Sequence, residues 1–144
     1  MSRYFTKTLA SLEPYTPGEQ LKIADIVKLN ANENPYPPAP LAFADVTYSF
    51  YTVLCDLLHI PQHIIPLEAD LTIDLKKYCG LHETIVIANP NAPTSLLAPV
   101  DAIEEVLQTN PDNIVIVDET YVEFAPAGSS CLPLLEKYDN LVIT

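Results

Sequence analysis

Glycine and positively charged side chains are scarce in this chain of 144 residues, and each shortage excludes a class of function. The chain has three glycines against 14 prolines, so it cannot build the glycine-rich loop that holds a nucleotide phosphate. Seven lysines and arginines stand against 19 acidic residues, which gives a formal net charge of -12. Because nucleic-acid backbones are bound by clustered cations, this composition argues against a nucleic-acid partner.

Long apolar runs and paired cysteines are also absent. The longest apolar runs are only as long as a strand, and no basic, apolar and small-residue opening is present, so we predict no membrane span and no signal peptide. Cys55, Cys79 and Cys131 show no CxxC spacing, which predicts free thiols and a cytoplasmic location. The apolar fraction of 49% nevertheless indicates a folded domain.

Strand-like and helix-like segments alternate along the chain. The pattern predicts strands at residues 26–29, 62–67, 84–88, 114–117 and 141–143, and helices at 47–58, 74–79, between Pro99 and Asn110, and at 132–137. Strands that are apolar throughout and alternate with helices favour an α/β fold, a partial three-layer sandwich with a mostly parallel sheet. We expect residues 1–40 to form an arm and a proline-rich loop, and residues 41–144 to form the sheet domain.

Asp118 is the strongest candidate for chemistry. It follows the apolar run Ile114 to Val117, and ligands of parallel α/β sheets lie outside the carboxyl ends of the strands. A structural role is the alternative, in which Asp118 caps a turn or a following helix. The sequence NPNAPTS at residues 89–95 follows another predicted strand, and such a turn can direct side-chain amides toward a ligand.

Four motifs occur in an order that is typical of one enzyme family. They are NANENPYPP at residues 30–38, ADVTYSFY at 44–51, ANPNAPTS at 88–95 and IVDETYVEF at 116–124. With them the chain resembles histidinol-phosphate aminotransferase, a pyridoxal-phosphate enzyme of the aspartate-aminotransferase fold. The resemblance implies that residues 41–144 are part of the large, cofactor-binding domain. It also implies a homodimer that transfers an amino group between histidinol phosphate and 2-oxoglutarate in histidine biosynthesis.

The same resemblance implies roles for single residues. Asp118 would pair with the protonated pyridine nitrogen of pyridoxal phosphate and keep the ring cationic. Tyr121 would donate to the phenolic oxygen of the ring, and Tyr48 would stack on the ring face. Asn91, or alternatively Asn89, would bind the phenolic oxygen or the substrate carboxylate. Two residues near the amino terminus would face the substrate: Tyr15 and Asn32.

The sequence also departs from the family pattern. Ala92 and Ser95 replace the second Asn and the Gly of the commoner NPNNPTG. The segment that supplies a Gly-Ser-Asp turn for the cofactor phosphate is missing after Pro40, and so are the Schiff-base lysine in its Ser-Lys motif and all arginines except Arg3. We therefore expect an internally deleted, C-terminally truncated relative that is inactive alone. The alternative is a non-catalytic fragment that pairs with a full-length aminotransferase subunit.

Two readings outside this family are weaker. Cys55 with His59, and Cys79 with His82, have spacings that zinc could use, but the two pairs follow no known linked pattern, and we predict no metal site. A phosphate-accepting receiver domain would fit the alternation of strands and helices, yet the lysine expected after its last strand is absent.

Overall fold

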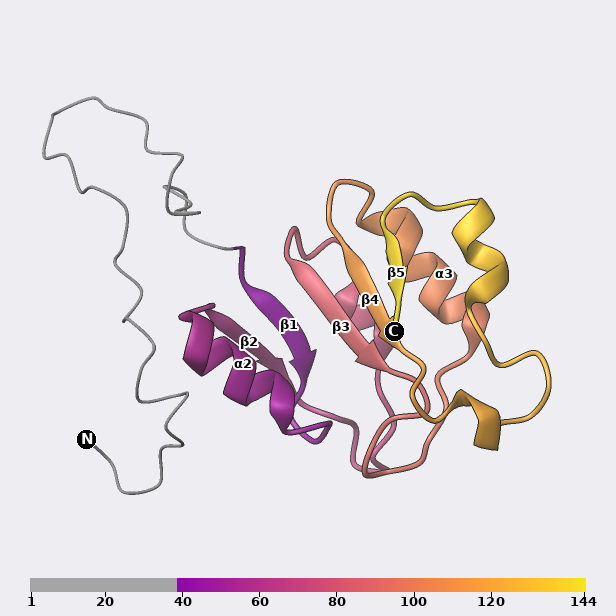
Figure 1. Cartoon of the computed structure of the whole chain (residues 1–144), viewed down its shortest axis with the longest axis horizontal. Coiled ribbons are helices and arrows are strands. Elements are labelled where there is room, and N and C mark those ends of the chain that lie inside the picture. Colours follow the sequence, from indigo (N-terminus) through magenta and orange to yellow (C-terminus); the bar gives the residue numbers. More distant parts are fainter. Residues whose placement is uncertain (1–38) are drawn as a thin grey trace, which may run out of the picture. The chain divides into compact units, whose positions relative to one another are not determined.

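A parallel sheet of five strands organises the computed structural model, which describes residues 39–144 (Figure 1). The strands are β1 (Leu41–Ala44), β2 (Gln62–Ile65), β3 (Thr84–Ala88), β4 (Val115–Asp118) and β5 (Leu141–Ile143). Their order across the sheet is β2-β1-β3-β4-β5, and every neighbouring pair is parallel. The predicted α/β class is confirmed. The strand predicted at residues 26–29 lies outside the described residues.

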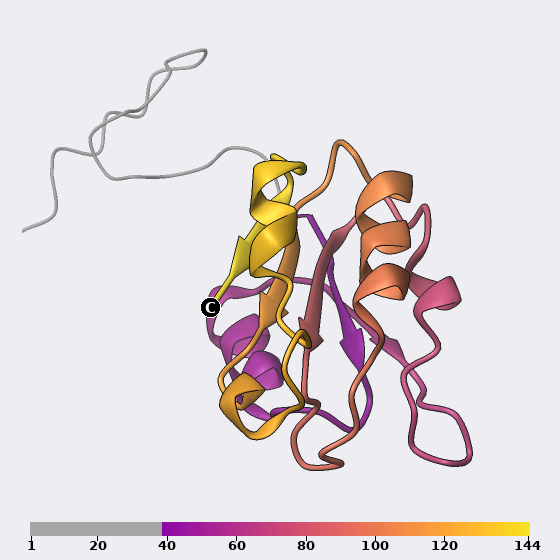
Figure 2. The same ribbon diagram turned by 90° about the vertical axis from the view of Figure 1, so that its right-hand side faces the viewer.

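Helices cover both faces of this sheet, which gives the predicted three layers. Helix α2 (Phe50–Leu58) packs on one face, whereas α3 (Val100–Thr109) and the 3-10 helices η1 (Leu75–Tyr78) and η3 (Leu132–Glu136) pack on the other (Figure 2). The short 3-10 helix η2 (Val122–Phe124) follows β4. Among residues 39–144, no helix has both the length and the apolar character needed to cross a bilayer.

Some of the predicted elements differ in kind or extent. The helix predicted from residue 47 begins at Phe50, and the strand predicted to residue 67 ends at Ile65. The helices predicted at 74–79 and 132–137 are 3-10 helices of four and five residues. Segments this short close too few hydrogen bonds to form a stable α-helix.

Strand β1 is the one strand of the described region that the sequence pattern missed. Its four residues follow a run of prolines and show no alternation of polar and apolar side chains. The strand forms because it lies between β2 and β3 and pairs with both. Ala42 and Phe43 are consequently almost completely buried on opposite faces. The strand conformation of this segment is thus determined by tertiary contacts, which the local sequence propensity does not reflect.

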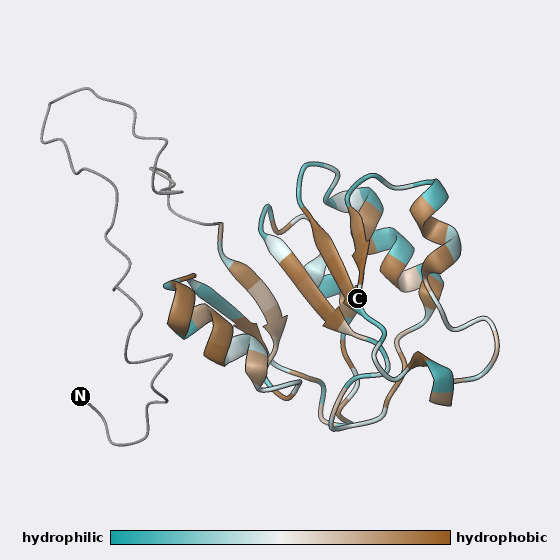
Figure 3. Cartoon of the chain, in the orientation of Figure 1, coloured by the Kyte–Doolittle hydropathy of each residue, from teal (hydrophilic) through white to brown (hydrophobic). Residues whose placement is uncertain are grey.

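Alternation along the central strands sorts the side chains into two apolar clusters. On β3, Ile85 and Ile87 join the cluster beneath α3, whereas Val86 joins the cluster beneath α2. The hydropathy colouring shows these central strands as mostly apolar (Figure 3). On β4, Val117 faces α3 and Ile116 faces α2. Since successive side chains of a strand point to opposite faces, Asp118 lies on the α2 side.

The chain reverses its direction across the sheet between β1 and β3. From β1 it moves outward to β2, and it then crosses back to β3 and continues to β5. The segments that leave the carboxyl ends of β1 and β3 therefore diverge at this point. Such a switch point is where open α/β sheets place their ligands.

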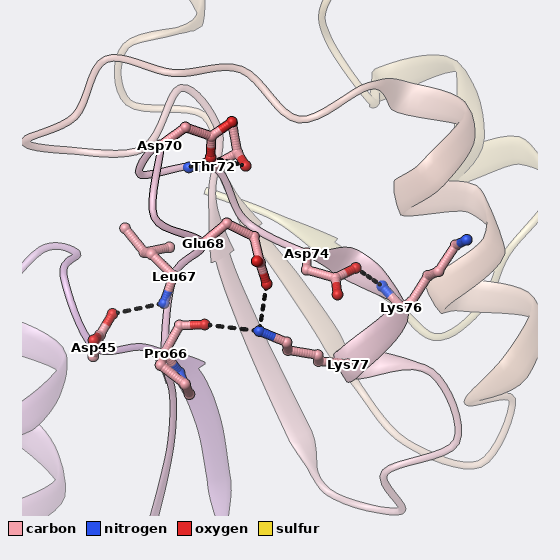
Figure 4. A network of polar contacts seen from close by, with 9 residues as sticks. All are labelled: Asp45, Pro66, Leu67, Glu68, Asp70, Thr72, Asp74, Lys76 and Lys77. Atoms are coloured by element: carbon pink, nitrogen blue, oxygen red, sulfur yellow. Dashed lines mark hydrogen bonds and ion pairs between the residues drawn. The ribbon is translucent and has the colours of Figure 1, made fainter.

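A network of polar contacts holds the long connection from β2 to η1 (Figure 4). The carboxylate of Asp45, at the end of β1, accepts a hydrogen bond of 3.0 Å from the Leu67 backbone N–H. The Lys77 ammonium pairs with Glu68 at 2.6 Å and donates to the Pro66 carbonyl at 3.3 Å. The charge of Lys77 is thus engaged at this connection.

Asn110, at the end of α3, joins α3 to η1 and the residues after it. Its side chain is buried, and the amide nitrogen donates to the carbonyls of Tyr78 and Val106, both at 2.9 Å. Its amide oxygen accepts from the Leu81 N–H, also at 2.9 Å. One side chain therefore satisfies three buried or partly buried backbone groups of three segments.

We predict that Asn110→Ala lowers the free energy of unfolding by about 1–3 kcal/mol, because it leaves backbone donors and acceptors unpaired in the interior. Urea denaturation of the purified chain measures the change. Asn113→Ala is the matched control, since the Asn113 side chain makes no hydrogen bond within residues 39–144. Equal shifts of the urea midpoint in the two variants would contradict the role of Asn110.

Candidate functional site

A small cavity lies where the chain leaves the carboxyl ends of β1, β3 and β4. Its volume is about 140 Å³, close to that of an engineered cavity of about 150 Å³ that holds a benzene ring. The connection after β1 contributes Tyr48, the turn after β3 contributes Pro90 and Ala92, and the end of β4 contributes Asp118 with Thr120 and Tyr121. The cavity has the size of a single aromatic ring.

Asp118 provides the only charge among the lining residues of this cavity. Its Oδ1 accepts hydrogen bonds from the Thr120 hydroxyl at 2.6 Å and from the Thr120 backbone N–H at 3.0 Å. Its Oδ2 accepts from the Tyr51 hydroxyl at 2.5 Å. The alternative role of Asp118 as the cap of a turn is therefore real, and it uses only one of the two carboxylate oxygens.

These hydrogen bonds control the ionisation of Asp118. Burial raises the pKa of the carboxyl group, but the donors of Thr120 and Tyr51 together outweigh burial and hold the pKa below its ordinary value. At neutral pH the group is an anion that can only accept hydrogen bonds. A ring that carries an N–H and a positive charge is the ligand that such a wall favours.

Two half-exposed tyrosines stand at the cavity beside Asp118. The Tyr48 ring meets the Tyr51 ring edge-on, with centroids 5.5 Å apart and planes at 88°. The Tyr121 ring lies 6.4 Å from the exposed Phe124. Both phenols retain an exposed surface that a ligand can contact. The structure thus brings together three of the predicted site residues, Asp118, Tyr48 and Tyr121.

Asn91 does not line this cavity, although the next residue, Ala92, does. The Asn91 side chain is buried, donates to the Val46 carbonyl at 2.9 Å and accepts from the Thr47 hydroxyl at 2.8 Å. It therefore fixes the segment that carries Tyr48. The role toward the cofactor that the resemblance implies for Asn91 stays a prediction.

The Asn89 side chain also forms hydrogen bonds with the backbone. Its amide oxygen accepts from the Ala98 N–H at 2.8 Å, and its amide nitrogen donates to the Ala98 carbonyl at 3.2 Å. These two bonds close the loop of residues 89–98, which contains Ala92. Asn89 and Asn91 thus shape the loop that forms one wall of the cavity, and Asn91 also lines a wider pocket that adjoins it.

A second, wider pocket of about 570 Å³ adjoins the cavity and shares Pro90, Ala92 and Tyr121 with it. Its lining is mainly apolar and includes Phe124, which is 86% exposed. No lysine or arginine lines either pocket in the described part of the chain. Lys77 is engaged at the β2 to η1 connection, and Lys137 pairs with Glu104 at 3.3 Å.

The cysteine and histidine pairs that were weighed as zinc ligands do not form a cluster in the described part of the chain. Cys55 is buried in the apolar cluster beneath α2, and the imidazole of His63 contacts Glu83 at 2.6 Å. Between residues 39 and 144 no three cysteine, histidine or acidic side chains gather in a way that could hold an ion.

Tyr51 and Thr120 are site residues that the sequence analysis missed. The spacing of Tyr48, Tyr51, Cys55 and Leu58 is that of the apolar face of a helix, so the pattern alone indicates a packing role for Tyr51. A signal was available, since a buried tyrosine needs a partner for its hydroxyl group whereas a phenylalanine does not. The predicted substrate residues Tyr15 and Asn32 lie outside the described residues.

Residues 36–144 match the family Aminotransferase class I and II. The chain belongs to this family. Curated relatives include the histidinol-phosphate aminotransferase of Lactococcus lactis subsp. cremoris (strain MG1363), which is 36% identical over 198 residues covering 94% of this chain and 55% of the relative. Histidinol-phosphate aminotransferase 2 of Dechloromonas aromatica (strain RCB) is 33% identical over 210 residues, which cover 99% of this chain and 58% of the relative. The predicted resemblance is confirmed.

These alignments also show how the aminotransferase chain differs from its relatives. It spans a little over half the length of the curated relatives it matches. The alignment with the Lactococcus protein runs over 198 residues, although this chain has only 144. Tens of positions inside the aligned region of the relative therefore have no counterpart here.

Solved structures show the same fold. The histidinol-phosphate aminotransferase of Clostridium acetobutylicum superposes with a TM-score of 0.66 and 21% identity, covering 73% of this chain and 33% of that one. The histidinol-phosphate aminotransferase of Sinorhizobium meliloti, solved in complex with pyridoxal-5'-phosphate, gives a TM-score of 0.65 and 20% identity. The superposition covers 74% of this chain and 31% of that one.

We predict that the stabilising effect of the Asp118 charge is lost in acid. Because the folded-state pKa is lowered, the charge stabilises the fold above the unfolded value of about 3.9, and this contribution disappears as the pH falls further. Unfolding curves of the wild-type chain and Asp118→Asn from pH 7 to pH 2 should differ by a constant amount above about pH 5 and by less as the pH falls through the folded-state pKa. A difference that does not change with pH would contradict the prediction.

Proposed function

We propose that this chain holds the pyridine ring of pyridoxal phosphate in the cavity between Tyr48 and Tyr121. The observation that carries the proposal is the ionised Asp118 carboxylate in the wall of a cavity with the size of one ring. The names of the relatives support a place in histidinol-phosphate transamination. When bound, the cofactor supplies a cationic ring that withdraws electrons from the substrate carbon.

Each wall of the cavity would have one task. Asp118 would accept the hydrogen bond of the ring N–H and keep that nitrogen protonated. The exposed face of Tyr48 would contact the ring plane. The Tyr121 hydroxyl would donate to the oxygen substituent of the ring. All three side chains are present around the cavity without any rearrangement of the backbone.

No cationic side chain among the described residues lines the pockets where the phosphate end of the cofactor would lie. A phosphate is usually held by arginine, lysine or backbone N–H groups at a helix N-terminus, and no cation lines either pocket within residues 39–144. No described lysine lines the cavity where it could anchor the cofactor. We therefore expect weak, reversible binding and no transamination by the 144-residue chain alone.

Several properties of the whole enzyme belong to the same proposal. Histidinol phosphate and 2-oxoglutarate would be the substrates, histidine biosynthesis the process, a homodimer the assembly and the cytoplasm the location. The names of the curated relatives support the substrate class and the process. Unpaired cysteines in the described region are consistent with a reducing compartment.

Titration of the purified chain with pyridoxal phosphate, followed by absorbance, tests the proposal. We expect saturable binding that weakens by roughly 10-fold or more in Asp118→Ala, since a hydrogen bond between two charged groups is lost. Asp112→Ala removes an exposed acidic side chain elsewhere and should bind as the wild type does. Equal binding by all three chains would contradict the assignment of Asp118.

Borohydride treatment of the same mixtures separates reversible from covalent binding. We expect mass spectrometry to find no stoichiometric adduct on a lysine. A stable adduct on one specific lysine would refute the expected inactivity, while it would leave the ring site intact.

Pairing with a full-length aminotransferase subunit is the second candidate function. The exposed side of α2 supports it, because Val53, Leu57 and Leu58 are all more than half exposed and such apolar surface favours a partner. Size-exclusion chromatography of the chain with a full-length relative should give a mixed species that Leu57→Lys weakens. Leu132→Lys, at an equally apolar exposed site on η3, serves as the control. Separate elution of the two proteins would exclude this candidate.

A further inference from the structure

We propose that Tyr51 is a positioning residue, which sets the Asp118 carboxylate through its hydroxyl group and the Tyr48 ring through its edge. This role deepens the proposed function, because the two side chains that Tyr51 contacts are the ones expected to hold the ring of the cofactor. The positioning itself can be measured without any ligand.

The first contact is the hydrogen bond that the Tyr51 hydroxyl donates to Oδ2 of Asp118, at 2.5 Å. It connects helix α2 to the carboxyl end of β4, residues that are 67 positions apart in sequence. Asp118 lies on the α2 side of the sheet because it follows Ile116 by two positions. Tyr51 is only 9% exposed and packs with Phe43, Cys55 and Val86. The phenol therefore approaches the carboxylate from a fixed place in the core.

The hydrogen bond from Tyr51 also determines how many further hydrogen bonds the Asp118 carboxylate can accept. An ionised carboxylate offers about four acceptor positions, two on each oxygen. The Thr120 hydroxyl and backbone N–H use both positions on Oδ1, and Tyr51 uses one on Oδ2. One position, on Oδ2, remains unused by the described residues. A single N–H of a ligand ring matches this remaining position.

Tyr51 stays protonated, and so remains a donor, at neutral pH and well above it. Burial first, and then the bond to Asp118, raises the pKa of this phenol far above its ordinary value. The hydroxyl consequently does not compete with a ligand as a base. It stabilises the ionised form of Asp118, which is the form that accepts from a ring N–H.

The second contact fixes the other wall of the cavity. The Tyr51 ring meets Tyr48 edge-on at 5.5 Å and Phe43 edge-on at 6.0 Å. The partial positive charge at the edge of one ring favours the face of another. Tyr48 itself is half exposed, so this contact limits where its ring can lie. Tyr51→Phe removes the bond to Asp118 and keeps the ring contact, which separates the two effects.

The experiment compares the ligand-free wild type with Tyr51→Phe and Tyr138→Phe. Tyr138→Phe is the matched control, because its hydroxyl also donates to a carboxylate, Glu104, at 2.9 Å but on the other face of the sheet. Carbon NMR follows the titration of the Asp118 side chain. We expect Asp118 to titrate at higher pH in Tyr51→Phe and at the wild-type pH in Tyr138→Phe. Unchanged titration in Tyr51→Phe would overturn the proposal.

A second variant covers the case in which Tyr51→Phe does not fold. Site-specific 3-fluorotyrosine at position 51 preserves the shape of the side chain and makes its hydroxyl a stronger donor. Asp118 should then titrate at lower pH than in the wild type. No change in this variant would equally overturn the positioning role.

Binding of pyridoxal phosphate to the same variants distinguishes this proposal from the proposed function. We expect Kd to rise roughly 3- to 10-fold in Tyr51→Phe, as for the loss of one hydrogen bond, and to stay constant in Tyr138→Phe. Absence of binding by the wild type would refute the cofactor site and leave the NMR result to decide on Tyr51. Binding with a shifted Asp118 titration but unchanged Kd would refute the link between positioning and affinity.

Discussion

The hydrogen bonds that Asp118 accepts connect the parts of this molecule that form its candidate site. A buried apolar strand ends in a charge, and a charge at the edge of the core needs donors. Thr120 supplies two of them from the turn that follows β4, and Tyr51 supplies one from α2. The helix layer, the sheet and the turn therefore meet at one carboxylate. Its orientation is a consequence of how the core packs.

Periodicity predicted the fold well where the environment of a segment is regular. Residues 84–88 and 141–143 are apolar throughout and form strands with the predicted bounds. Leu41–Ala44 was missed because its four residues carry no pattern, and only its neighbours β2 and β3 make it a strand. The helix predicted at 132–137 is a 3-10 helix because the segment is too short to close the hydrogen bonds of a stable α-helix.

At the site, the position of a residue in the sequence predicted whether it lies near the cavity. The direction in which its side chain points could not be predicted in this way. Asp118 could be selected because it follows a buried strand, and the resemblance added Tyr48 and Tyr121. Whether Asn91 or Ala92 faces the cavity depends on the path of the loop, which bonds between Asn89 and Ala98 fix across nine residues. The bond from Tyr51 joins residues 67 apart. No local pattern contains information about contacts over such separations.

In the proposed cofactor site, the carboxylate that would hold the ring and the cations that would hold the phosphate depend on different contacts. The Tyr51 hydroxyl, which belongs to the core, holds the half-buried Asp118 carboxylate, so a chain that folds this way keeps this carboxylate at the cavity. Removing the Asp118 carboxylate would leave the buried Tyr51 hydroxyl without its partner. The cations for a phosphate would be lysine or arginine side chains, and none of these lines the pockets of the described region. The position of the Asp118 carboxylate is therefore a property of the fold and does not depend on any group that would bind a phosphate.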